Sequence, residues 1–133
     1  MISKKKCCVA FSMVFTVLLL AGCGNSVSKE FAAAEDNFRA AHKKVQSLLE
    51  TGIDYSSPCI VYHPFTNQAK DACRGLENAL HQMKYVAYAT SENENDKARY
   101  NSIDQSKARN DLEKLNKRVN SFSHDFKYNC GIW

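Results

Sequence analysis

Three segments of the chain place apolar residues at intervals of three and four, and this repeat constrains the fold more than any other feature. The spacing follows one face of an α-helix. It recurs over residues 29–51, 66–89 and 95–129. The apolar positions are Phe31, Ala34, Phe38, Ala41, Val45 and Leu48; then Ala69, Ala72, Leu76, Ala79, Leu80, Met83 and Val86; then Ala108, Leu112, Leu115, Val119, Phe122 and Phe126. They predict an all-α, up-down-up three-helix bundle, with a long helical hairpin as the alternative.

Local signals indicate where the first two helices begin and end. Ser26 or Ser28 can cap the first helix, and Gly52 can close it. The stretch from Ile53 to Phe65 holds two prolines and lacks a helical repeat. We therefore expect it to be an ordered connection that packs across the end of the bundle, with the second helix starting near Thr66.

The third helix has two competing start signals. Continuing the second stripe beyond Thr90 would bury polar residues, so the helix has to stop or turn between Thr90 and Asn95. Capping-box patterns begin at Ser91 and at Ser102. We expect one helix that starts around Asn95 and packs best beyond Ser102.

The N-terminus reads as an export signal. A basic tip, Lys4 to Lys6, precedes an apolar run from Val9 to Leu20, which is too short to cross a bilayer comfortably. Two small residues follow, as a signal peptidase requires. The stretch Leu20-Ala21-Gly22-Cys23 resembles a bacterial lipobox.

The lipoprotein resemblance implies a role for Cys23. Its thiol would carry a diacylglyceryl group, the chain would be cut before it, and the new α-amine would be acylated. Two or more acyl chains anchor a protein stably where one does not. The implied organisation is a signal peptide over 1–22, a lipidated tether over 23–28 and a helical domain over 29–133. Gly24, rather than Asp, after the cysteine implies the periplasmic side of the outer membrane in preference to the inner membrane.

Removal of the signal changes the charge of the mature chain. The full chain has 18 basic and 14 acidic side chains, a net charge of +4. Losing Lys4, Lys5 and Lys6 reduces this to +1, which removes the main support for nucleic-acid binding. Basic residues of the third segment alternate with acidic ones and predict a solvated face.

The mature domain keeps three cysteines: Cys59, Cys73 and Cys130. In an oxidising compartment two of them are expected to pair. An antiparallel bundle puts all three near one end, but Cys73 lies further along the second helix, so we rank Cys59–Cys130 first and treat either pairing of Cys73 as the alternative. The unpaired Cys73 is expected to pack on the flank of its helix rather than to be catalytic.

Neither a metal centre nor an enzyme active site is expected. Cys59, Cys73, Cys130 and His63 are suitable zinc ligands by type, but their spacing is poor and export favours disulfides. The sequence carries no phosphate-binding glycine loop, no GxSxG and no paired-carboxylate pattern. We therefore predict a protein that is not an enzyme and has no cofactor.

Aromatic residues gather near the predicted cysteine end and form a candidate partner-binding surface, because such residues anchor interfaces. The alternative is that they only cover the end of the bundle. The candidates are Tyr55, Tyr62, His63, Phe65, Tyr128 and Trp133.

Three functions follow as hypotheses. The first is a lipid-tethered adaptor, accessory or exclusion factor that binds another envelope protein. The second is a structural lipoprotein that self-associates through its apolar stripes. The third is a small-ligand carrier, which would need a cavity among the small residues of the second helix.

Overall fold

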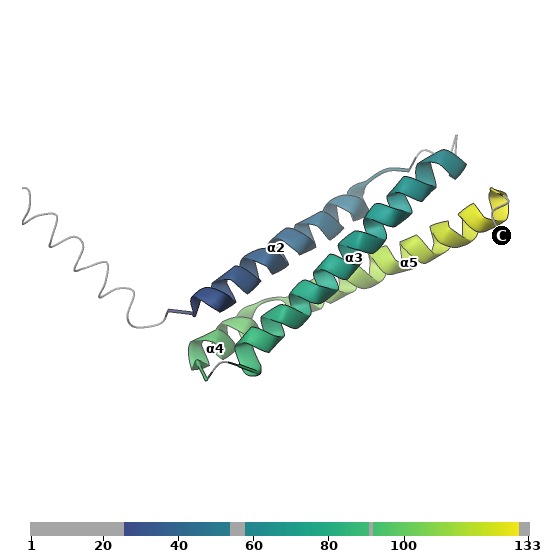
Figure 1. Cartoon of the computed structure of the whole chain (residues 1–133). Helices are drawn as coiled ribbons and strands as arrows, with labels where there is room; N and C mark the ends of the chain where they lie inside the picture. The colour runs from purple at the N-terminus through teal and green to yellow at the C-terminus, as the bar shows by residue number, and fades with distance from the viewer. Residues whose placement is uncertain (1–25, 54–57, 91, 131–133) are drawn as a thin grey trace, which may run out of the picture.

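The computed structural model describes residues 26–53, 58–90 and 92–130. Within them lie four helices: α2 over Lys29–Glu50, α3 over Pro58–Tyr88, α4 over Glu94–Ser102 and α5 over Gln105–Asn129. α2 and α5 run in the same direction and α3 runs against both (Figure 1). The predicted all-α, up-down-up bundle is confirmed, with a short additional helix before the last long one.

The predicted apolar stripes form the core. Phe31, Leu76, Met83 and Leu115 are fully buried, one or two from each long helix. α3 packs against both α2 and α5, whereas α2 and α5 contact each other less. α3 is thus the helix that both others contact. Its buried alanines at 69, 72 and 87 are small, so the neighbouring backbones can approach closely.

α3 begins earlier than the sequence indicated, so the prediction of a long connection up to Phe65 is wrong. The helix starts at Pro58 and continues through Pro64, although a proline cannot donate the backbone hydrogen bond to the residue four positions before it. Tyr62 and Phe65 extend the buried stripe of Ala69 by the same steps of four and three. Their burial compensates for the hydrogen bond that is lost at Pro64, and Pro58 favours the start of the helix because its φ angle is already helical.

The expected single third helix is also wrong, because both start signals are used. Asn93 caps α4, with its side-chain oxygen accepting from Asn95 N, and Asp104 caps α5 by accepting from Lys107 N. Between them Ile103 adopts an extended conformation and packs on the core. Both caps lie two residues after the serines that the capping-box patterns indicated.

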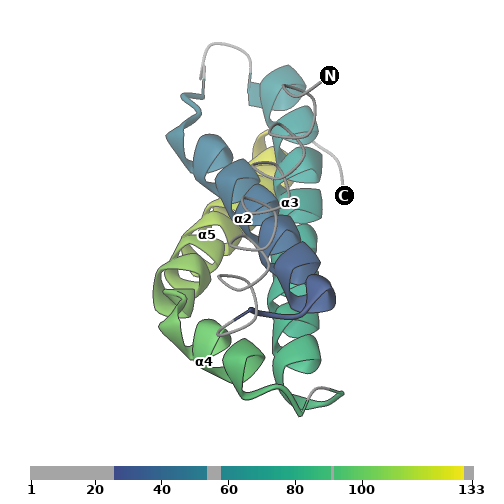
Figure 2. The ribbon, with the colours of Figure 1, turned by 90° about the vertical axis from the view of Figure 1, so that its left-hand side faces the viewer.

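The two ends of the bundle differ. α4 lies at the end where α2 begins and α3 ends (Figures 1 and 2). There Ser28 caps α2 by accepting from Phe31 N, as one of the two serines expected. The start of α3 with Cys59 and the end of α5 with Cys130 lie at the other end, which we call the disulfide pole. None of the described helices is both long and apolar enough to cross a membrane.

Candidate functional site

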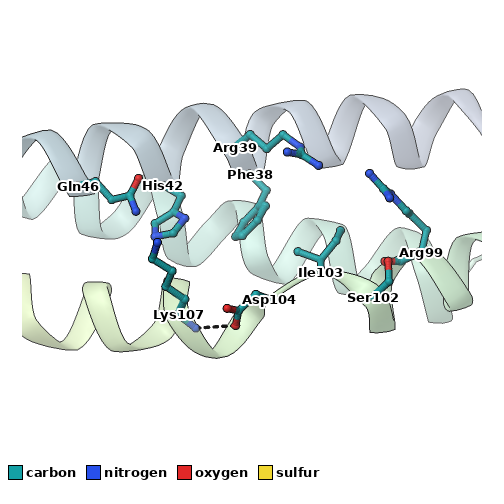
Figure 3. A pocket seen from close by; sticks show the side chains of 9 residues that line it. All are labelled: Phe38, Arg39, His42, Gln46, Arg99, Ser102, Ile103, Asp104 and Lys107. Carbon is teal, nitrogen blue, oxygen red and sulfur yellow. Dashed lines mark hydrogen bonds between the residues drawn. The ribbon is translucent and has the colours of Figure 1, made fainter.

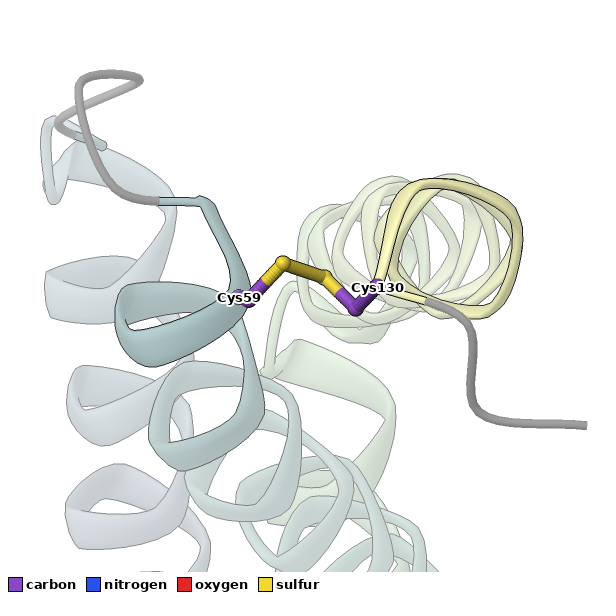
Figure 4. Close-up of a disulfide and its surroundings, with 2 residues drawn as sticks. All are labelled: Cys59 and Cys130. Carbon is purple, nitrogen blue, oxygen red and sulfur yellow. A yellow bond between two sulfur atoms is a disulfide. The ribbon is translucent and has the colours of Figure 1, made fainter.

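One disulfide joins α3 to α5 at the disulfide pole, the end that contains Cys59, Ile60, His63, His124 and Tyr128. Cys59 lies in the first turn of α3 and Cys130 is the C-cap of α5, with Cα atoms 5.6 Å apart (Figure 4). The pairing ranked first from the sequence is therefore the one present. It closes a loop of 71 residues and covalently joins the first turn of α3 to the end of α5.

Two large side chains of the disulfide pole are left in solvent. Ile60, next to the disulfide, is 76% exposed, and Tyr128 is 61% exposed. The Tyr128 ring lies 4.4 Å from the imidazole of His124, and the imidazole of His63 lies 5.5 Å from the ring of Phe126. An exposed isoleucine and an exposed tyrosine at the same end of the bundle are the residue types of a small interaction surface.

Two members of the predicted aromatic surface are not part of it. Tyr62 and Phe65 are buried: Tyr62 stacks on Phe122 at 4.9 Å and Phe65 meets the same ring edge-on at 5.4 Å. The guanidinium of Arg118 lies over Phe65 and Phe122. This part of the prediction is corrected, because the early start of α3 turns both residues inward.

The other four predicted residues form two groups. His63 and Tyr128 are exposed at the disulfide pole. Tyr55 and Trp133 lie outside the described residues. Ile60 was not singled out from the sequence, although the helical spacing from Tyr62 could have placed it on the opposite, solvent-facing side of α3.

A second feature, which the sequence did not reveal, is a polar seam between α2 and the α4–α5 segment. Its α2 members are Ser28, Glu35 and His42, which are seven residues apart and so recur on one helix face. Their partners are Asp96, Arg99 and Asp111. The partners follow in the same order along the chain because the two segments run parallel.

The centre of the polar seam is a carboxylate between two guanidinium groups. Glu35 is buried, and Arg99 donates to it from Nε at 3.0 Å and from Nη2 at 2.7 Å. Arg39 donates to the same carboxylate from one turn along α2. The hydrogen bonds from Arg99 lower the pKa of Glu35 below its ordinary value, and Arg39 adds to this against the opposing effect of burial.

The seam continues toward the disulfide pole. His42 Nε2 lies 2.9 Å from Asp111 Oδ2, which also accepts from Gln46. Burial would raise the pKa of Asp111, but the hydrogen bonds from His42 and Gln46 outweigh it and the pKa is lowered. Arg118 then donates to the last carbonyls of α2, those of residues 48, 49 and 51. These bonds satisfy carbonyls that a helix end leaves without partners.

A groove of about 420 Å³ opens above this seam (Figure 3). Its lining includes Arg39, His42, Arg99, Asp104 and Lys107. Both guanidinium groups already bind Glu35, and the imidazole of His42 already contacts Asp111. These charged groups therefore join α2 to α4 and α5. The groove is a consequence of this packing, and we assign no ligand to it.

The thiol of Cys73 does not have the features of a nucleophile. It is buried on α3, and burial, with a smaller effect from the charge of Glu77, raises its pKa. A reactive cysteine needs the opposite shift. Cys73 instead packs in the core, further inside than the helix flank expected for it.

The zinc ligand set considered from the sequence is not available. Cys59 and Cys130 are bonded to each other, which removes two of the four candidate ligands. Across residues 26–53, 58–90 and 92–130 no three His, Cys, Asp or Glu side chains come together as metal ligands.

No family model, curated protein or solved structure matches this chain. The chain itself carries two indications of function: the N-terminal sequence around Cys23 and the contrast between the two ends of the bundle.

Proposed function

We propose that this protein is a lipid-anchored envelope lipoprotein, held through Cys23 on the periplasmic side of the outer membrane. In this proposal the disulfide pole binds another envelope protein, so that the chain acts as an adaptor, accessory or exclusion factor. The anchor is supported by the basic tip, the short apolar run and the lipobox-like stretch ending at Cys23.

The observation that carries the proposal is the polarity of the bundle. The chain enters the bundle at Ser28, only five residues after Cys23, and this entry point is at the opposite end from the disulfide pole. α3 extends for 31 residues between the two ends, about 45 Å at 1.5 Å per residue. A lipid on Cys23 would hold one end at the membrane and leave Ile60 and Tyr128 accessible to a partner.

The two other hypotheses receive less support. A self-associating spacer would need its apolar stripes between chains, but Phe31, Leu76 and Leu115 are buried within one chain. A ligand carrier would need a cavity among the small residues of α3. The groove there is a hollow of about 350 Å³ on the α2–α3 surface, lined in part by Asn37, Asn78 and Gln82 rather than by a closed apolar wall.

Site-specific photocrosslinking in intact cells tests the proposed binding surface. With a photoreactive amino acid at Ile60 or at Tyr128, we expect one adduct of the same larger mass from both positions. The matched control is Arg74, whose side chain is 73% exposed at mid-length of α3 and should give no adduct. An adduct from Arg74 alone, or none from either residue of the disulfide pole while the variants are stably produced, would place partner binding elsewhere.

A further inference from the structure

The chain is fastened to the bundle at the point where the tether ends. Ser28 N donates to Asp96 Oδ1 at 2.8 Å, and Ser28 Oγ donates to Asp96 Oδ2 at 2.7 Å. Asp96 is fully buried and also accepts from Asn93. Charge-assisted hydrogen bonds of this kind are strong, so separating Ser28 from α4 requires substantial free energy. Val27 also packs against the core, so the free length of the tether ends before Ser28.

The tether is short compared with the bundle. Five residues separate Cys23 from Ser28, and a fully extended chain covers about 3.5 Å per residue, so the span is at most about 17 Å. This is well below the length of α3, about 45 Å. A lipid on Cys23 therefore keeps the α4 end close to the bilayer, while the disulfide pole is beyond reach unless the bundle lies flat.

Two exposed tyrosines lie at this same end. Tyr85 and Tyr88, on the last turns of α3, are 47% and 45% exposed. Tyr88 Oη donates to Asn101 on α4, and its ring meets that of Tyr100 edge-on at 5.5 Å. Tyr100 follows Asp96 by four residues, about 6 Å along α4. Tyr88 and Ser28 therefore both contact α4, which places this tyrosine and the end of the tether at the same end of the bundle.

The surface around the tyrosines suits a phospholipid interface. A hollow of about 320 Å³ is lined by His81, Lys84, Tyr85, Tyr88 and Ala89. Tyrosine is favoured at the membrane–water boundary, because its ring is apolar and its hydroxyl can stay hydrated. The ammonium group of Lys84 can approach lipid phosphates while its stem lies along the rings.

We infer that the exposed face of α3 around Tyr85 and Tyr88 rests on the phospholipid surface to which Cys23 is anchored. This inference deepens the proposed function and rests on its lipid anchor. It assigns opposite surroundings to the two exposed aromatic regions: lipid for Tyr85 and Tyr88, and water or a partner protein for Tyr128.

The test uses the protein as purified from the membrane, reconstituted in vesicles of phosphatidylethanolamine and phosphatidylglycerol. Trp133, the single tryptophan, is replaced by phenylalanine, and Tyr85→Trp is compared with Tyr128→Trp. Both sites are exposed, so both variants should fold, which circular dichroism can confirm. With lipids brominated near the headgroup end of their acyl chains, Trp at position 85 should lose most of its emission and Trp at position 128 should lose little.

Each other result overturns the inference in a recognisable way. Quenching at neither position, with lipid present on Cys23 by mass, means that the anchor holds but the tyrosines face water or a protein. Equal quenching at both positions means that the bundle lies flat. A protein without lipid on Cys23 removes the anchor of the proposed function and this contact with it.

Discussion

Cys59→Ser is expected to lower the free energy of unfolding by about 4 kcal/mol. The disulfide closes a 71-residue loop that includes most of α3, all of α4 and all of α5. In the chain-entropy description, opening a loop of this length raises the conformational entropy of the unfolded chain, which lowers the free energy of unfolding by that amount. A small bundle has little surplus stability, so the loss is a large fraction of the total.

Urea unfolding followed by circular dichroism measures this effect. Reduction of the wild-type protein should give the same loss as the substitution, because both open the same bond. Cys73→Ala is the control, since Cys73 is buried but unpaired and its replacement leaves the link intact. If the reduced and oxidised proteins unfold at the same urea concentration, the disulfide does not brace the bundle.

Glu35→Gln is expected to lower the free energy of unfolding by about 1.5–3 kcal/mol at neutral pH, the range for hydrogen bonds to a charged group. The substitution keeps the shape of the side chain but removes the negative charge between Arg99 and Arg39. Because Glu35 is buried and joins α2 to α4, the loss should exceed that of an exposed pair. Glu113→Gln is the matched control: Glu113 pairs with Lys117 in solvent, where such pairs contribute little to stability, so this variant should unfold like the wild type.

The pH dependence of the same comparison follows from the direction of the shift. The pKa of Glu35 is lowered from 4.5 in the folded protein. Its contribution is therefore complete above that pH and is lost as the pH falls through the lower folded value. The difference in unfolding free energy between wild type and Glu35→Gln should be largest at neutral pH and should shrink on acidification. A difference that stays constant down to strongly acidic pH would mean that the charge of Glu35 is not what stabilises the seam.

The apolar repeat predicted most of the fold because it determines which face of each helix is buried. The stripes through Phe31, Leu76 and Leu115 are the core. The disulfide followed from the same pattern, since only an antiparallel neighbour brings Cys59 and Cys130 together. Helix starts were less predictable where two influences compete. Pro64 argued for a break, but burial of Tyr62 and Phe65 stabilises the helix through it.

The polar seam could not be read from the sequence for a physical reason. Glu35 and His42 have the residue types of an exposed face, and their burial depends on Arg99 and Asp111, more than sixty residues away. A heptad spacing of Ser28, Glu35 and His42 was present, but polar residues at such intervals usually face solvent. The burial of Tyr62 depends in the same way on a distant partner, because its ring stacks on Phe122 of α5.

We propose that one end of the bundle is lipid-anchored through Cys23, whereas the other end is closed by the disulfide between Cys59 and Cys130. The intact mass of the protein purified from membranes tests the anchor and the presence of one disulfide at once. We expect a chain that begins at Cys23, carries a diacylglyceryl group and an amide-linked acyl chain, and lacks the two hydrogens removed by one disulfide. A chain that retains residues 1–22, or that begins at Cys23 without lipid, would contradict this account.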